Sequence, residues 1–99
     1  MASYTLIENL ADLVGAAQPD SITSRTFYRG EEMRAILFAF DTGQELSEHT
    51  ASLPAVIHIL SGEAAVTLGG DSHTLRAGAW IAMPPNLKHS VTAITPVTM

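Results

Sequence analysis

The sequence predicts an all-β domain, built as a sandwich or a barrel. Short segments rich in β-branched and aromatic residues follow one another along most of the chain. Gly or Pro turns separate them at intervals of roughly 8–12 residues, which is typical of these two architectures. Some segments are apolar at both odd and even positions, as strands covered on both faces are. The 99 residues are the length of one domain.

The first twenty residues differ from the rest. Thr5–Glu8 has the form of a capping box, and an apolar helical face follows it up to Gly15. The positions on that face are Leu6, Leu10, Leu13 and Val14. We therefore expect a short helix of about ten residues, with a strand over Thr5–Ile7 as the alternative. Residues 1–20 would form a leader packed on a barrel of residues 21–99.

The strands follow in order from Ile22. Asp41–Gly43 reads as a turn, and Gly69-Gly70-Asp71 as the turn of a hairpin. The predicted strands are Ile22–Tyr28, Met33–Phe40, Val56–Leu60, Ala64–Leu68, His73–Leu75, Trp80–Met83, His89–Ile94 and Val97–Met99.

The composition is short of charge and rich in apolar residues. Hydrophobic residues make up 46% of the chain and charged residues 15%. A single small domain has limited interior for so many apolar side chains, and a subunit interface is the usual cover for the excess. We therefore expect a homodimer, formed through outward side chains such as Val56 and Leu60.

Charge and cysteine usage exclude several classes of function. The net charge is −5 and the five basic residues are scattered, so neither nucleic acid nor a membrane surface is an expected partner. The chain has no cysteine, which excludes disulfides and zinc sites of the cysteine type. No long apolar run and no signal peptide is visible, so the expected location is the cytoplasm.

Two spaced motifs carry a family resemblance. Gly43, five residues, His49 and then Gly62 resemble the first cupin motif, G-x5-H-x-H-x3-E-x6-G. Gly78, five residues, Pro84 and then His89 resemble the second, G-x5-P-x-G-x2-H-x3-N. The chain is thus similar to the small single-domain microbial cupins, with their RmlC-like jelly roll (the double-stranded β-helix). This resemblance implies a cupin barrel preceded by the short leader.

The resemblance also shows what this chain lacks. In metal-binding cupins two His and a Glu of the first motif and one His of the second converge inside the barrel. Here His49 and His89 stand at two of these positions, and Ala51 and Ala55 at the other two. Ala93 stands where the second motif ends in Asn. The motif therefore implies a degenerate metal site.

Strand alternation then predicts a ligand pocket that is mostly apolar. Every second side chain of an extended chain shares a face, so each motif position brings its neighbours two residues away. The expected lining is Ser47, His49, Ala51, Ala55, Ile57, Ile59, His89, Val91 and Ala93. Apolar walls with a few convergent polar groups are typical of small-ligand sites.

No cofactor is certain. The two imidazoles of His49 and His89 suffice for a weakly held divalent metal such as Zn, Ni, Fe or Mn, but stable sites have at least three protein ligands. His58 faces away from Ala55 on a regular strand and would be a core or interface residue. His73 reads as an exposed hairpin residue, and Trp80 and Met83 as core residues.

Three functions remain. The favoured one is a non-catalytic module that binds a small molecule between His49 and His89. The first alternative is a metal-dependent enzyme, of the dioxygenase or isomerase type, with a non-standard third ligand. The second is a structural or assembly protein with an empty barrel. The fold hosts many chemistries, so it does not choose among them.

Overall fold

The computed structural model describes residues 3–99, and its regular structure is almost entirely β-strand. Within these residues one four-residue 3-10 helix, η1 (Leu10–Leu13), precedes nine strands. The strands are β1 (Ile22–Arg29), β2 (Arg34–Phe40), β3 (Glu45–His49), β4 (Ala55–His58), β5 (Glu63–Leu68), β6 (Asp71–Arg76), β7 (Trp80–Met83), β8 (His89–Ala93) and β9 (Val97–Thr98). The predicted all-β class is confirmed.

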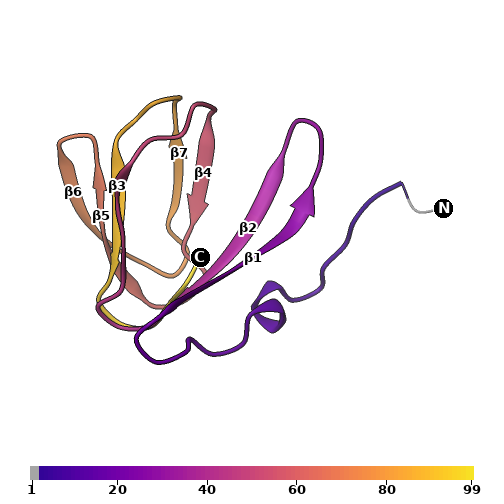
Figure 1. Ribbon diagram of the computed structural model, residues 1–99, viewed down its shortest axis with the longest axis horizontal. Helices are drawn as coiled ribbons and strands as arrows, with labels where there is room; N and C mark the ends of the chain where they lie inside the picture. The colour runs from indigo at the N-terminus through magenta and orange to yellow at the C-terminus, as the bar shows by residue number, and fades with distance from the viewer. Residues whose placement is uncertain (1–2) are drawn as a thin grey trace.

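The strands form two facing layers, which Figure 1 shows side by side. One layer is a four-stranded sheet in the order β3-β8-β5-β6. The other consists of β1-β2-β9 and β4-β7, joined where Ser61 bridges Thr98 and the Leu60 amide donates to the Thr98 carbonyl at 2.8 Å. Strands of the two chain halves pair with each other, as in β3–β8, β4–β7 and β2–β9, and all pairs are antiparallel. This is the jelly-roll arrangement.

The core lies between the two layers. Phe40, Ile59, Val91 and Val97 are at most 2% exposed, and Ala64, Val66 and Ala93 complete the buried cluster. Alternation along β8 explains its shape, because His89, Val91 and Ala93 are buried while the residues between them are half-buried. Burying the Val91 side chain contributes about 1.5–3 kcal/mol, so β8 is central to stability as well as to the site.

The leader is less helical than expected. The predicted ten-residue helix is only η1, which Asn9 caps by accepting a hydrogen bond from the Ala11 amide at 3.2 Å. None of the four residues of η1 is buried, and short helices without tertiary packing are marginal in water. The leader runs along the β1–β2 hairpin (Figure 1), tied by a 3.2 Å bond from Arg25 Nη1 to the Leu13 carbonyl. The division of the chain into a leader of residues 1–20 and a barrel of residues 21–99 stays a prediction.

Two details concern surfaces. Trp80 is 62% exposed on β7, so its assignment to the core was wrong, whereas Met83 is buried at 4%. Strand alternation explains the difference, since Ile81 and Met83 take the inner face of β7 and leave Trp80 outside. Within residues 3–99 no helix has the length and apolar character needed to cross a membrane.

Candidate functional site

His49 and His89 meet on neighbouring strands at one end of the barrel. They are direct partners in the β3–β8 pairing, and their ring centroids lie 4.1 Å apart with the planes inclined by 58°. The histidines are forty positions apart in the sequence, and the crossed pairing of the jelly roll brings them together. The sequence motifs predicted both residues, and the structure places them in contact.

An irregularity in β3 sets the position of His49. Leu46 opposes Val91 and His49 opposes His89, so three steps along β3 match two steps along β8. A strand with an extra residue no longer alternates regularly. As a result Leu46 packs against the core, while Ser47 is exposed and only its carbonyl contacts the His49 ring. Strict alternation had expected the Ser47 side chain beside that of His49.

Each ring is oriented by a backbone carbonyl of its own strand or of the turn that leads into it. His49 Nδ1 lies 2.7 Å from the Ser47 oxygen, and His89 Nδ1 lies 2.9 Å from the Leu87 oxygen. A carbonyl oxygen can only accept, so Nδ1 carries the hydrogen in both rings. In the neutral form this leaves the lone pair on Nε2, the atom through which a histidine with a bonded Nδ1–H coordinates a metal or accepts from a ligand.

The two rings differ in burial. His49 is exposed, whereas His89 is only 6% exposed. Among residues 3–99 no buried side-chain nitrogen or oxygen lacks a hydrogen-bond partner, and the His89 ring is bonded through Nδ1 alone. Its Nε2 atom therefore keeps some contact with solvent although the residue is buried. A buried imidazole with one accessible nitrogen is suited to binding.

The other predicted pocket residues divide into two groups. Ile59, Val91 and Ala93 belong to the packed core, with at most 2% exposure, and Ile57 packs against it. Ala51 and Ala55 are half-buried. Solvent thus reaches the histidine end of the predicted pocket, and its deeper end is filled by side chains.

The donor set fits a weakly held metal and does not fit a closed site. In the part of the chain that the structure describes, no group of three or more His, Cys, Asp or Glu side chains could hold a metal ion. His58 does not supply a third ligand, because it opposes Trp80 on β4–β7 and is exposed while Ile57 faces the core. Two imidazoles alone leave most coordination positions to water or to a ligand.

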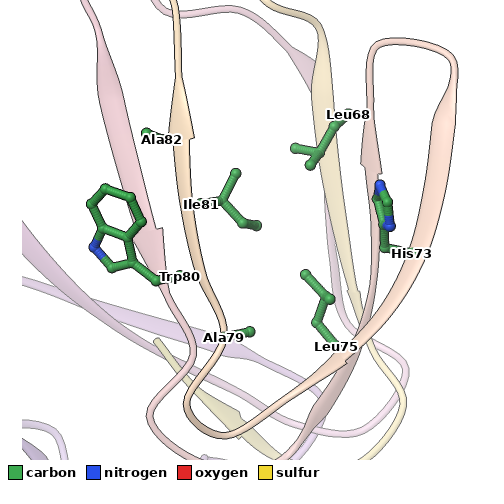
Figure 2. A pocket seen from close by; sticks show the side chains of 7 residues that line it. All are labelled: Leu68, His73, Leu75, Ala79, Trp80, Ile81 and Ala82. Carbon is green, nitrogen blue, oxygen red and sulfur yellow. The ribbon is translucent and has the colours of Figure 1, made fainter.

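A second feature was missed at the level of sequence. An opening of about 430 Å³ lies between β6 and β7 and is lined by Leu68, His73, Leu75, Ala79, Trp80, Ile81 and Ala82. Figure 2 shows Ile81 and Ala79 facing Leu68 and Leu75 across it, with His73 beside them and Trp80 on the far side of β7. His73 is exposed as expected, but it also borders this opening. The sequence could have indicated this, because His73 and Leu75 lie two residues apart and so share a face of β6.

The comparisons with known proteins agree on the fold. The family model for the cupin domain matches residues 36–99. A conserved protein of unknown function from Streptococcus pyogenes superposes with a TM-score of 0.85 at 26% identity, over 99% of this chain and 85% of that one. A cupin superfamily protein from Desulfitobacterium hafniense gives 0.85 at 23% identity, over 91% and 82%.

Enzymes share this fold too. A salicylate 1,2-dioxygenase from Pseudoaminobacter salicylatoxidans gives a TM-score of 0.72 at 19% identity, over 84% of this chain and 26% of that one. A search of the curated proteins finds no match. The family model covers well over half of the chain, and the jelly roll and both spaced motifs agree with it. The chain therefore belongs to the cupin superfamily.

Proposed function

We propose that this cupin binds a small molecule at the paired Nε2 atoms of His49 and His89. The observation that carries the proposal is the matched Nδ1 contact of the two rings, at 2.7 and 2.9 Å to backbone carbonyls. These contacts hold both tautomers ready before any ligand arrives, which lowers the ordering cost of binding. A ligand with two hydrogen-bond donors suits the two lone pairs.

A weakly held divalent metal is the other occupant that suits this pair. His49 and His89 would hold it through Nε2, and Ala51 and Ala55 would leave the remaining positions to water or to ligand atoms. A bound metal would supply Lewis acidity. The chain's own part is to orient the two rings and to keep one of them, His89, in a buried setting at 6% exposure.

The two alternatives make different demands. A metal-dependent enzyme would need a third metal donor, and residues 3–99 place none with the pair. A structural protein would need no reachable Nε2 on His89. The accessible nitrogen favours binding over both.

Ni²⁺ titration of the untagged protein tests the proposal, because Ni²⁺ reports free imidazole nitrogens. The variants are His49→Ala and His89→Ala, with His58→Ala on the outer face of β4 as the matched control. We expect each site variant to weaken binding about 10-fold or more and the control to leave it unchanged. Equal affinity in all three variants would show that the pair is not the site. Metal that stays stoichiometric through dialysis would favour the enzyme alternative.

We also propose that a second copy of the chain covers the outer face of β4 and β7. Val56 and Trp80 are 56% and 62% exposed there, and the β4–β7 register places His58 opposite Trp80 and Val56 opposite Ala82. Large apolar and aromatic side chains grouped on one sheet face are typical of protein interfaces. This surface matches the excess of apolar residues in the composition.

A further inference from the structure

The opening between β6 and β7, called here the β6–β7 slit, lies between the end strands of the two layers. β6 ends the four-stranded sheet and β7 ends the opposite layer. The slit of about 430 Å³ is within the size range of small-molecule sites. Its size therefore favours a small ligand.

The walls of the slit are apolar. Leu68 and Leu75 from the β5–β6 hairpin face Ile81 across it, and all three are half-buried (Figure 2). Ala79 closes one end without filling it. These side chains are covered on one side by the core and open on the other, so an apolar molecule would remove their remaining surface from water.

Two lining residues carry a polar side-chain atom, His73 and Trp80, and the Trp80 ring lies on the far side of β7. The polar group on the β6 side is therefore the imidazole of His73. A neutral imidazole can donate through one nitrogen and accept through the other, so a hydroxyl group can bond to either. No hydrogen bond to the His73 ring from residues 3–99 competes with such a ligand.

The charges around the slit disfavour an anion. Asp71 shares the inner parity of β6 with His73 and Leu75, and the whole chain carries a net charge of −5. The cation of this strand, Arg76, has the opposite parity and lies 3.9 Å from Glu63. An anion in the slit would thus lose hydration without gaining a cationic partner.

From these observations we propose that the β6–β7 slit is a binding site for an uncharged, mainly apolar small molecule with one hydroxyl group that bonds to His73. The site is separate from the imidazole pair. Leu68 is the β5 partner of His89, so the two sites are neighbours on one sheet, but the proposed ligand needs no contact with either histidine of the pair.

Three probes with the same six-membered ring test the proposal by NMR on ¹⁵N-labelled protein. Cyclohexanol is expected to give saturable amide shifts at residues 73, 75, 79 and 81, with a dissociation constant of about 1 mM. Cyclohexanecarboxylate should bind about 10-fold or more weakly, because its charge is desolvated without a partner. Methylcyclohexane should bind the wild type more weakly than cyclohexanol does. In His73→Leu, methylcyclohexane and cyclohexanol should bind with equal affinity.

Matched variants locate the binding. Ala79→Leu should fill the slit and abolish the cyclohexanol shifts, whereas Ala65→Leu, on the exposed face of β5, should leave them unchanged. If Ala79→Leu does not fold, Leu75→Phe serves the same purpose.

Several outcomes would overturn the proposal. These are the absence of saturable shifts in the wild type, shifts confined to His49 and His89, tighter binding of the carboxylate, and signals of residues 73 and 75 on β6, away from the proposed dimer face, that move on dilution without any probe. The last would show that a second copy occupies the slit. His49→Ala should retain cyclohexanol binding. This variant therefore separates the slit proposal from the proposal that His49 and His89 bind a ligand, because each can fail without the other.

Discussion

Replacing Gly62 by Ala gives the sharpest test of how the two layers are joined. Gly62 has φ +86°, and a Cβ added there would overlap the Pro96 carbonyl oxygen and lie 2.9 Å from its carbon and 3.0 Å from Val97 Cα. All three are backbone atoms, so no side-chain rotation can relieve the contact. Gly78 is the matched control, because its φ is +98° and nothing lies within 4 Å of its added Cβ.

The magnitudes follow from these contacts. Both substitutions place an L side chain in a left-handed conformation, at a cost of about 1–2 kcal/mol. Gly62→Ala must in addition displace Pro96 and Val97, and Val97 is a core residue at 2% exposure whose burial contributes about 1.5–3 kcal/mol. The shift also strains the hydrogen bond from the Thr98 amide to the Ser61 carbonyl, 3.1 Å long, which adds about 1 kcal/mol. We therefore expect Gly62→Ala to cost about 3 kcal/mol more than Gly78→Ala.

Urea unfolding followed by circular dichroism measures both variants, with the free energy extrapolated to water. The expected order of stability is wild type, Gly78→Ala and then Gly62→Ala, which can be largely unfolded without denaturant. Equal stabilities of the two variants, within about 0.5 kcal/mol, would refute the reasoning. The contact between the added Cβ and Pro96 would then have no effect on the free energy of unfolding.

Phe40→Ala should lower the free energy of unfolding by about 3–5 kcal/mol in the same urea assay, because the ring is 0% exposed; a loss under about 1 kcal/mol would contradict its place in the core. Arg76→Ala should change it by less than about 0.5 kcal/mol, because the ion pair with Glu63 is 3.9 Å long and the arginine side chain is 81% exposed; a larger loss would mean that the pair is shielded from solvent. If a second copy covers β4 and β7, light scattering should give the mass of a dimer for the wild type and of a monomer for Trp80→Glu; a monomeric wild type would contradict the proposed interface.

The turns were predictable because local chemistry specifies them, and the site positions because they stand in a family motif. Gly43, Gly62 and Gly78 all have positive φ, as their places at strand ends suggested. The cupin spacing identified His49 and His89 as a pair although the sequence separates them widely, because a shared fold transfers contacts that periodicity alone does not reveal.

The missed features depend on tertiary context. The helical face of the leader is at most half-buried, at Leu10, Leu13 and Val14, so only η1 forms. β3 was not assigned as a strand because Glu45–His49 is mostly polar, and its irregular register could not be inferred from alternation. His73 borders the β6–β7 slit only because β7 of the opposite layer faces β6, a relation that the residues of β6 do not encode.

The carbonyl contacts of the two rings also bear on how readily such a site can change. The Ser47 and Leu87 oxygens lie two residues before the histidines they hold, so the support of each ring does not depend on what occupies the site. The alanines at positions 51 and 55 can therefore be exchanged without dismantling the pair. Two substitutions, Ala51→His and Ala55→Glu, would complete the cupin donor set on rings that are already oriented. For an engineer, the barrel is a host in which the number of metal donors can be raised in steps from two to four, with affinity as the readout.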